Sequence, residues 1–205
     1  MTWQGARVLA LGYKNLGELQ AKDIRELKRG SVECDLTFAG FVIISCPLKA
    51  TSRNAIKEIQ HASHHTVMIT GDNPLTACHV AQELKLTRKQ TLVLTASGDN
   101  SGEEQMWCWQ SLDKTTTLPL VPDGGVKKLK QNFDLCVTGE AFPLLQSNGP
   151  LSKSLSLLWP VVKVYARVAP KQKEFVVTKM KSLGYVTLMC GDGTNDVGAL
   201  KHADV

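Results

Sequence analysis

The sequence lacks any long apolar run. No stretch of its 205 residues approaches the roughly 18 consecutive apolar residues that a membrane-spanning helix requires. The start of the chain, Met1-Thr2-Trp3-Gln4, also lacks the basic and then apolar segments of a secretory signal peptide. We therefore expect this chain, taken alone, to be soluble.

Charge of one sign is not concentrated either. The 24 lysines and arginines against 19 aspartates and glutamates give a net charge of +5, and they form no basic block. A nucleic acid or an anionic membrane surface is therefore not implied as a partner. The proportions of charged residues (21%) and apolar residues (43%) are those of a globular chain, whose length suits one domain or one domain with part of another.

Spacings typical of metal or disulfide sites are also missing. No two cysteines are spaced Cys-x-x-Cys, so we expect buried, reduced thiols rather than a disulfide framework or a zinc site. A metal cluster at His61, His64 and His65 is a further alternative, but the polar end of a helix before a strand is the preferred interpretation. The cysteines are Cys34, Cys46, Cys78, Cys108, Cys136 and Cys190.

What the sequence does contain is a regular alternation of short apolar runs with helical patterns. Strands are predicted at 6–13, 37–46, 66–70, 91–95, 134–138, 163–166 and 185–190. Helices are predicted at 21–29, at 52–61, from the cap Asn73 through Pro74 to Leu84, and from Pro170 to Leu183 with Gly184 as its stop. This alternation predicts an α/β fold with βαβ crossovers and a parallel sheet.

Residues 97–125 interrupt this alternation. They are polar and rich in turn residues, so we expect a surface excursion rather than core. Within them, Trp107 and Trp109 alternate with other residues, which predicts a short strand with one side packed down.

Three polar segments follow predicted strands, and ligands of parallel sheets bind beyond the carboxyl ends of the strands. The first is Gly191-Asp192-Gly193, after which Asn195 is expected to cap a helix and Asp196 to share a face with Asp192. Two carboxylates beside free backbone N–H groups suit Mg²⁺ and a phosphoryl group. The alternative is a plain turn with solvated aspartates.

The second segment is Thr70-Gly71-Asp72, directly before the helix that Asn73-Pro74 opens. A hydroxyl and successive backbone amides can hold phosphate oxygens there, although an ordinary capped turn gives the same pattern. The third segment places Lys173 in the first turn of a helix, where it could neutralise a transferring phosphoryl group or be an ordinary surface lysine.

The order threonine, lysine and Gly-Asp-Gly resembles the second to fourth motifs of the haloacid-dehalogenase superfamily, whose enzymes form an aspartyl phosphate. The spellings "TGDNPLTA", "RVAPKQKE" and "CGDGTNDVGALKHADV" resemble the phosphorylation domain of P-type ATPases. Over nearly the whole chain, the similarity is to the endoplasmic-reticulum branch of the fifth class. It implies a haloacid-dehalogenase-like (Rossmannoid) parallel sheet with helices on both faces.

The same resemblance implies roles for individual residues. Asp192 would be a Mg²⁺ ligand, and Asn195 and Asp196 would order the phosphate site. Thr70 and Gly71 would bind the transferred phosphoryl group, with Asp72 shaping the loop beside them. Lys173 would pair with phosphate charge, and Arg167 corresponds to the arginine that precedes it in the family's segment. Lys49, in a hinge spelled Cys46-Pro47-Leu48-Lys49, would have a weaker role at ATP, because lysine lacks the bidentate fork of the family's arginine.

The family's nucleophile motif, Asp-Lys-Thr-Gly-Thr, is absent. "LDKTTT" at 112–117 carries Asp113, but Thr116 replaces the glycine, no buried strand is predicted before it, and it follows the second motif. We expect a polar surface loop there. The resemblance further implies that 1–34 are the tail of a nucleotide-binding domain and that 35–205 are an incomplete phosphorylation domain. Without its nucleophile strand, that domain should have unpaired strand edges, exposed apolar surface and marginal stability.

The function implied is that of a fragment of a P-type ATPase, which couples ATP hydrolysis through an aspartyl phosphate to transport across, or extraction from, the endoplasmic-reticulum membrane. Mg²⁺ and ATP are the implied cofactors, with transmembrane helices or cations as substrate and this segment facing the cytosol. The other domains of the parent are the implied partners, and the chain alone is expected to be inactive. Two alternatives stay open: a truncated, non-catalytic phosphate-binding or nucleotide-binding module, and a soluble phosphatase, which needs an Asp-x-Asp motif that 1–50 do not offer.

Overall fold

The computed structural model describes residues 6–44, 47–97, 106–121, 125–146 and 152–205. The chain forms two compact units, residues 1–47 and 48–205. The predicted division into 1–34 and 35–205 stays a prediction about the parent's domains; in the structure, the strand after residue 34 belongs to the first unit.

The first unit is built on a two-stranded ribbon, and none of its described residues belongs to a hydrophobic core cluster. Strand β1 (Arg7–Tyr13) pairs antiparallel with β2 (Thr37–Ile44), which confirms both predicted strands within the described residues. Two short helices, α1 (Ala21–Glu26) and α2 (Arg29–Val32), replace the predicted helix at 21–29, and neither has a buried residue. Large apolar side chains of the ribbon stay exposed, as in Phe38 (60%) and Phe41 (65%). A lone ribbon of this kind is marginally stable in water.

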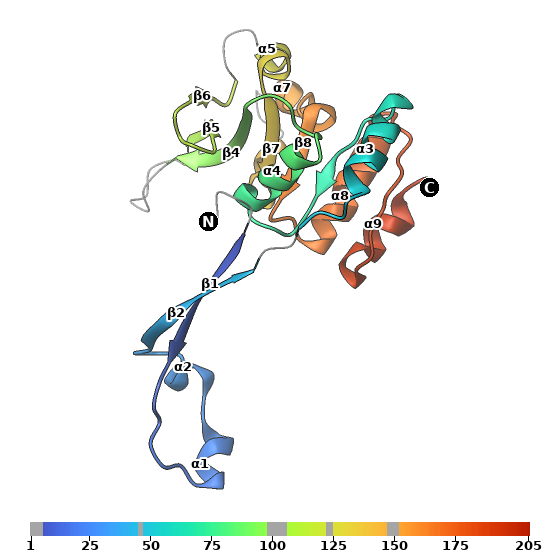
Figure 1. Ribbon diagram of the computed structural model, residues 1–205. Coiled ribbons are helices and arrows are strands. Elements are labelled where there is room, and N and C mark those ends of the chain that lie inside the picture. The colour runs from blue at the N-terminus through green and yellow to red at the C-terminus, as the bar shows by residue number, and fades with distance from the viewer. Residues whose placement is uncertain (1–5, 45–46, 98–105, 122–124, 147–151) are drawn as a thin grey trace. The chain divides into compact units, whose positions relative to one another are not determined.

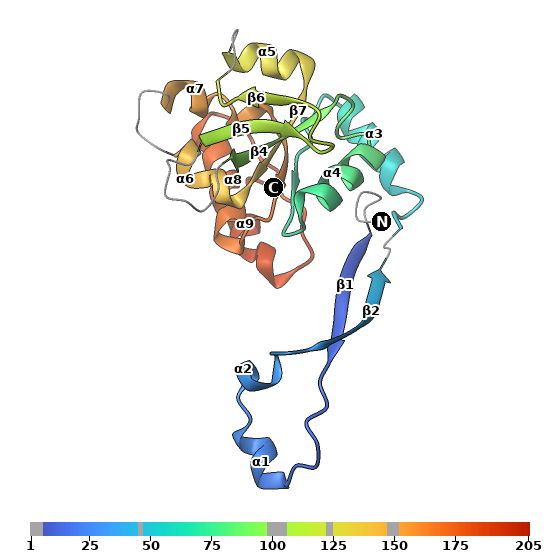
Figure 2. The ribbon, with the colours of Figure 1, turned by 90° about the vertical axis from the view of Figure 1, so that its left-hand side faces the viewer.

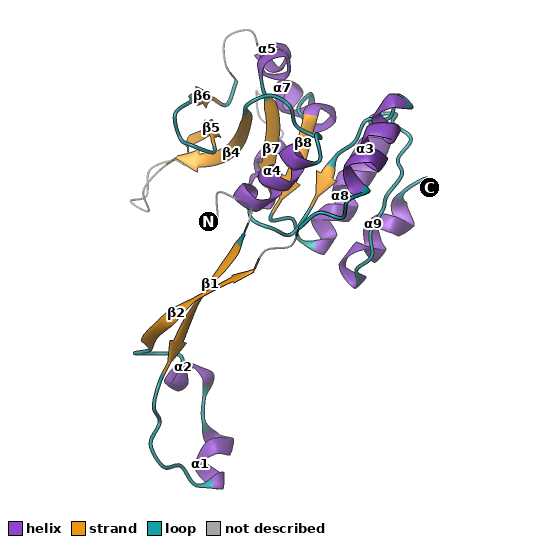
Figure 3. Ribbon diagram, viewed as in Figure 1, coloured by secondary structure: helices purple, strands orange, loops and turns teal. Residues whose placement is uncertain are grey.

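The second unit is built on a six-stranded sheet in the order β3-β8-β7-β4-β5-β6 (Figures 1 and 3). The four strands β3, β8, β7 and β4 are mutually parallel, whereas β5 and β6 extend the sheet as antiparallel strands. The bounds are β3 Met68–Ile69, β8 Val162–Ala166, β7 Asp134–Thr138, β4 Thr91–Ser97, β5 Met106–Ser111 and β6 Thr117–Pro119. The predicted α/β fold is confirmed, and the predicted parallel pairing holds for four of the six strands.

Helices cover both faces of this sheet (Figure 2). On one face, Ala77, Cys78 and Ala81 of α4 pack against Cys136, Val164 and Ala166 of the sheet. On the other, a larger core joins Leu135 and Val137 to residues of α5, α6, α7 and α8. The bounds are α3 Ser52–His61, α4 Pro74–Glu83, α5 Gly125–Asn132, α6 Phe142–Leu145, α7 Ser152–Ser156, α8 Pro170–Ser182 and α9 Val197–His202. Among the described segments, no helix is both long enough and apolar enough to cross a membrane.

The segment 97–125 was predicted as a surface excursion, and that prediction is wrong in part. Its described residues supply β5 and β6, and the predicted strand around the two tryptophans is confirmed. Trp109 is fully buried, and its indole N–H donates a hydrogen bond of 3.0 Å to the Leu120 carbonyl. Because the indole nitrogen is satisfied by a backbone carbonyl directly after β6, this polar stretch can carry a core residue.

The predicted strand at 185–190 does not form. Val186 and Leu188 are 85% and 71% exposed, and the backbone groups of Thr187 and Met189 bond only with Asp204 and Val205. Apolar β-branched residues become a strand only where a neighbouring strand exchanges hydrogen bonds with them. No described strand pairs with this segment, so it does not join the sheet.

Five of the cysteines are free, and Cys46 lies outside the described residues. Cys78 and Cys136 are buried together, and their hydrogen bond, followed by burial, raises the pKa of the Cys136 thiol. Cys34 and Cys190 are exposed, so the prediction of buried thiols is wrong for these two.

Candidate functional site

The carboxyl ends of β3 and β8 are tied to each other by backbone hydrogen bonds. The Thr70 N–H donates to the Tyr165 carbonyl at 2.9 Å, and the Val168 N–H donates back to the Thr70 carbonyl at 3.0 Å. One turn further, the Arg167 N–H donates to the Asp72 carbonyl at 2.8 Å. The second and third sequence motifs, almost a hundred residues apart, therefore meet at one edge of the sheet.

The Thr70-Gly71-Asp72 turn is ordered from within. The Thr70 hydroxyl accepts a hydrogen bond from the Asp72 N–H at 3.1 Å, and Asn73 then caps α4 by accepting from the Thr76 N–H at 3.0 Å. The predicted cap and the helix start at Pro74 are confirmed. Gly71 is exposed, and a methyl group there would meet only the Val168 carbonyl, at 3.9 Å. Packing alone therefore does not require glycine at this position.

Replacing Asn73 by alanine should lower the free energy of unfolding by about 1 kcal/mol, because the Thr76 N–H at the start of α4 loses its side-chain partner. Urea denaturation of the 205-residue chain measures this. Asn54→Ala, at an exposed position of α3 without a side-chain hydrogen bond in the described structure, is the matched control and should change stability by less than about 0.5 kcal/mol. An equal loss in both variants would contradict the capping role.

Lys173 and Asp196 form the strongest polar contact of the site. Lys173 lies in the first turn of α8, and its Nζ is 2.7 Å from Asp196 Oδ1. The two side chains are only 13% and 11% exposed. The hydrogen bond from Lys173 lowers the pKa of Asp196, so this carboxylate is charged at neutral pH. The third and fourth motifs therefore also meet, through a side-chain pair that the sequence analysis did not foresee.

The Gly191-Asp192-Gly193 turn presents Asp192 to solvent. A methyl group at Gly191 would lie 2.7 Å from Asp196 Cβ, so this glycine is required by the close approach of Asp196. The Gly193 N–H lies 3.4 Å from Asp196 Oδ2, and a 3₁₀ turn (Thr194–Asp196) begins there. Asn195 lies inside that turn, so its predicted capping role is wrong: the helical turn begins earlier, with Gly193 in the cap position.

Asp192 is suited to part of a Mg²⁺ site. Its side chain is exposed and makes no hydrogen bond or ion pair within the described structure, which leaves both oxygens available. The described residues contain no group of three or more acidic, histidine or cysteine side chains that could hold a metal by themselves. Mg²⁺ commonly takes one or two carboxylates and completes its shell with water and phosphate oxygens, so a single free carboxylate fits this ion.

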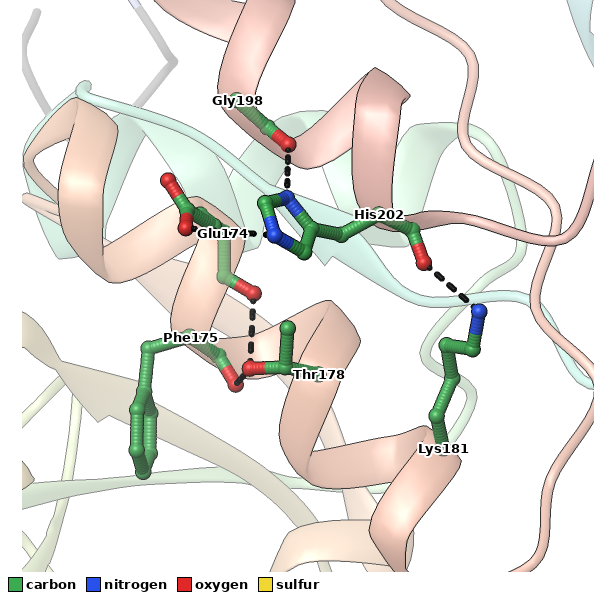
Figure 4. Close-up of polar contacts among 6 residues, drawn as sticks. All are labelled: Glu174, Phe175, Thr178, Lys181, Gly198 and His202. Atoms are coloured by element: carbon green, nitrogen blue, oxygen red, sulfur yellow. Dashed lines mark hydrogen bonds and ion pairs between the residues drawn. The ribbon is translucent and has the colours of Figure 1, made fainter.

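Helix α9, which follows Asp196, contacts α8 through His202 (Figure 4). His202 Nδ1 lies 2.8 Å from the Gly198 carbonyl, while His202 Nε2 faces Glu174 Oε1 at 3.6 Å. Lys181 Nζ bonds to the His202 carbonyl at 2.9 Å and to Asp204 at 2.8 Å. The bond from Lys181, followed by that of the Thr187 N–H, lowers the pKa of Asp204 to about 2. These contacts position the loop that carries the predicted acidic residues.

The side chains of two further predicted residues, Lys49 and Arg167, are exposed, and their roles stay predictions. Lys49 lies at the beginning of the second unit, and its side chain makes no hydrogen bond or ion pair in the described structure. The Arg167 side chain is largely exposed and lies 3.7 Å from Glu140, although its backbone belongs to the site.

One residue that the sequence analysis missed joins a third strand end to the site. The Gln172 side chain donates to the Gly139 carbonyl after β7 at 2.8 Å and accepts from the Ala169 N–H at 2.9 Å. A methyl group at Gly139 would lie within 2.6 Å of the Arg167 carbonyl, so only glycine fits. The available signal was a glutamine at the third position of a helix that starts with proline, a pattern of helix capping.

Asp113 lies in the tight turn between β5 and β6, away from the strand ends described above. Its Oδ1 accepts hydrogen bonds from the Ser111 hydroxyl (2.5 Å) and from both the N–H and the hydroxyl of Thr115. These bonds lower the pKa of Asp113 and explain the residue as a turn former. The strand that precedes it is the short one predicted around the two tryptophans: β5 ends at Ser111 and is only partly buried.

Known proteins match this chain along its entire length. It is 45% identical over 204 residues to the "Probable manganese-transporting ATPase PDR2" of Arabidopsis thaliana, covering all of this chain and 16% of the relative. The "Endoplasmic reticulum transmembrane helix translocase" of Schizosaccharomyces pombe is 44% identical over 98% of this chain, again 16% of the relative. The chain belongs to the fifth class of P-type ATPases. No family model matches it.

A more distant relative carries a different description. The "Vacuolar cation-transporting ATPase YPK9" of Saccharomyces cerevisiae is 32% identical over the whole chain. The chain spans about one sixth of the length of the curated relatives named here. Membership of the P-type ATPases is therefore common to these matches, whereas the transported species differs between their names.

Proposed function

We propose that this chain is the phosphate-handling part of a P-type ATPase that forms an aspartyl phosphate during ATP hydrolysis. The observation that carries the proposal is the convergence of three motifs: the Thr70 turn bonds to the Arg167-Val168 backbone, and Lys173 bonds to Asp196. Thr70 and Arg167 follow strand ends and Lys173 lies in the helix after β8, which is where parallel sheets bind phosphorylated ligands. Asp196 comes from a 3₁₀ turn that contacts this helix through Lys173.

Individual groups take defined tasks in this proposal. The Thr70 hydroxyl and the exposed Gly71 backbone bind the oxygens of the transferred phosphoryl group, and Asp72 shapes the turn. The Lys173 ammonium stabilises phosphate charge while Asp196 holds it in place at 2.7 Å. Asp192 supplies a ligand to Mg²⁺, which when bound neutralises charge on the phosphates of ATP. Asn195 helps to order the phosphate site, Arg167 precedes Lys173 in the same segment, and Lys49 makes a weaker contact with ATP.

The fold of the second unit is proposed to be haloacid-dehalogenase-like. An aspartate on a strand outside these residues would supply the nucleophile, and ATP and the other domains of the parent would be the partners. The exposed, unpaired segment Tyr185–Cys190 and the open edge of β3 are consistent with a missing neighbour strand. The chain by itself would then be inactive. The names of the relatives support an endoplasmic-reticulum membrane and transmembrane helices or cations as transported species. The segment itself is proposed to lie on the cytosolic side of that membrane.

Labelling with γ-³²P ATP and Mg²⁺ tests the proposal in a full-length protein carrying this segment. We expect acid-stable label that hydroxylamine releases, which is the behaviour of an acyl phosphate. Asp113→Asn should retain the label, because Asp113 is a turn former in the β5–β6 connection. Loss of label in that variant would identify Asp113 as the nucleophile and overturn the proposal, as would the absence of hydroxylamine-labile label in the unmodified protein.

A further inference from the structure

A second concave site lies at the amino-terminal ends of the parallel strands, opposite the carboxyl ends described above. It is a pocket of about 410 Å³, within the range of small-molecule sites. Its walls come from segments that precede parallel strands: the end of α3 before β3, the connection between α4 and β4, and the first residues of β7 and β8. The basic residues of this wall are Lys85, Arg88, Lys89 and Lys163, and the histidines are His61, His64 and His65.

The position of this pocket separates it from the site proposed above. Lys163 lies at the amino-terminal end of β8, whereas Arg167 follows the carboxyl end of the same strand. Four residues of extended chain place the two about 13 Å apart along the strand. Because β3, β8, β7 and β4 are parallel, all their starts lie on the pocket's side and all their ends on the other.

The cationic side chains of the pocket outnumber its acidic groups. Asp134 is the carboxylate of the wall, and its Oδ2 accepts hydrogen bonds from the backbone N–H groups of Arg88 (2.6 Å) and Lys89 (2.8 Å). The Asp134 carboxylate thus orders the connection between α4 and β4. It is bonded to backbone N–H groups there and not to the cationic side chains. Lys89 Nζ in turn bonds to the carbonyls of Lys130 and Gln131, which end α5.

The remaining cationic groups are available to a ligand. In the described structure, the side chains of Lys85 and Lys163 have no hydrogen bond or ion pair, and neither do those of the three histidines. Arg88 uses Nη2 for a bond of 3.2 Å to Gln60 Oε1, and Gln60 is fixed by Thr66, so the guanidinium is held beside the pocket with further N–H groups unused. Unpaired cationic side chains therefore line one pocket whose carboxylate, Asp134, is bonded to backbone N–H groups.

We propose that this pocket binds a compact ligand with several phosphate groups, either free in solution or as the headgroup of a lipid. The pocket has more cationic side chains than its single carboxylate, Asp134, can balance. A ligand with several phosphates would balance this excess charge, whereas a ligand with one carboxylate would not. Imidazole N–H groups add donors to phosphate oxygens, and the pocket's volume accommodates a ligand of this size. This ligand is separate from the ATP that the other edge of the sheet is proposed to handle.

Calorimetric titration of the 205-residue chain with inositol 1,4,5-trisphosphate at 0.1 M NaCl tests the proposal. We expect saturable binding that weakens by about tenfold in each of Lys163→Gln and Lys85→Asn, because each removes one charge-assisted contact. Asparagine is chosen for Lys85 because that residue has a φ of 61°, which asparagine tolerates. Absence of saturable binding to the unmodified chain would overturn the proposal.

Two matched controls separate this pocket from general charge and from the proposed phosphoryl site. Lys57→Gln removes an exposed lysine of α3 outside the pocket, and Arg167→Gln removes a cation at the other edge of the sheet. Both should change the affinity by less than about twofold. If either control weakens binding as much as Lys163→Gln, the pocket assignment is wrong. Circular dichroism of all four variants checks that each is folded.

The source of the phosphates is decided by sedimentation with vesicles. Phosphatidylcholine vesicles carrying 5 mol% (about one lipid in twenty) of a phosphoinositide bisphosphate are compared with vesicles carrying about the same total charge as phosphatidylserine. Retention on the first alone, sensitive to Lys163→Gln, supports a lipid headgroup. Binding of the free trisphosphate without retention on either supports a soluble ligand. Equal retention on both, unaffected by Lys163→Gln, would show attraction to any anionic surface and contradict the proposal.

Discussion

Replacing Asp192 by asparagine is expected to lower phosphoenzyme formation by more than about 100-fold in a full-length protein carrying this segment. The proposed reason is that the amide is a poor substitute for a carboxylate ligand of Mg²⁺, whose charge stabilisation is worth several kcal/mol in phosphoryl transfer. The side chain is exposed and has no partner in the described structure, so the substitution should leave the free energy of unfolding within about 0.5 kcal/mol. Rapid-quench labelling with γ-³²P ATP measures the rate.

The matched control for this experiment is Asp35→Asn. Asp35 is also exposed, lies in the other unit, and has a φ of 50° that asparagine tolerates. It should label at the unmodified rate. If Asp192→Asn also labels at that rate over a range of Mg²⁺ concentrations, Asp192 is not a ligand and the assignment of the Gly191-Asp192-Gly193 turn is wrong.

Replacing Lys173 by methionine is expected to slow phosphoenzyme formation by about 10²–10³-fold, the usual loss when one preorganised charge donor is removed from a transition state. It should also lower the free energy of unfolding by about 2 kcal/mol, because the nearly buried Asp196 carboxylate loses its charged hydrogen bond of 2.7 Å. Quenched-flow labelling of the full-length protein measures the first effect, and urea denaturation of the chain measures the second.

Lys171→Met is the control, since Lys171 lies in the same turn of α8, is exposed and has no side-chain partner in the described structure. It should change stability by less than about 0.5 kcal/mol and leave the labelling rate unchanged. Similar behaviour of the two variants would show that only the general charge of this helix matters. Lys173→Arg should recover most of the stability and less of the rate, because the guanidinium keeps the charge but not the shape.

The Lys173–Asp196 pair also predicts a dependence of stability on pH. Lys173 lowers the pKa of Asp196 in the folded state, so its stabilisation is fully present above the unfolded pKa of about 4 and is lost as the pH falls through the lower folded value. In Lys173→Met this contribution disappears. The difference in unfolding free energy between the two proteins should therefore shrink as the pH is lowered from 7 toward 2. A difference that stays constant over this range would contradict the pairing.

Much of the fold was predictable because its signals are local. Asn73-Pro74 specified the start of α4, Ser52 to His61 specified α3, and Gly184 with its φ of 89° specified the end of α8. Capping and proline geometry act within one turn of a helix, so neighbouring residues suffice to decide them. The strand at 185–190 failed for the opposite reason. Its apolar pattern was correct for a strand, but a strand also needs a partner, and sequence pattern does not show whether one is present.

The candidate site was also predictable only in part from the sequence. The motifs containing Thr70, Lys173 and Asp192 were visible as residue types after apolar runs, but their mutual contacts were not. Nothing in the sequence indicated that Lys173 would be held by Asp196 or that Gln172 would bind the Gly139 carbonyl. These contacts join segments 23 and 33 residues apart, and they depend on how the strand ends and α8 come together.

By itself, the sequence determined the class of fold, the boundaries of the main helices and, through the spelling of three motifs, membership of the P-type ATPases. It showed no basic block, and that observation was correct for the linear chain. Only the tertiary structure gathered Lys85, Arg88 and Lys163 around one pocket, because parallel strands bring their starting residues to a common edge regardless of their separation in sequence. Neighbouring residues decide where a helix begins and ends, whereas a site shared by several strands depends on the order and direction of the strands in the sheet.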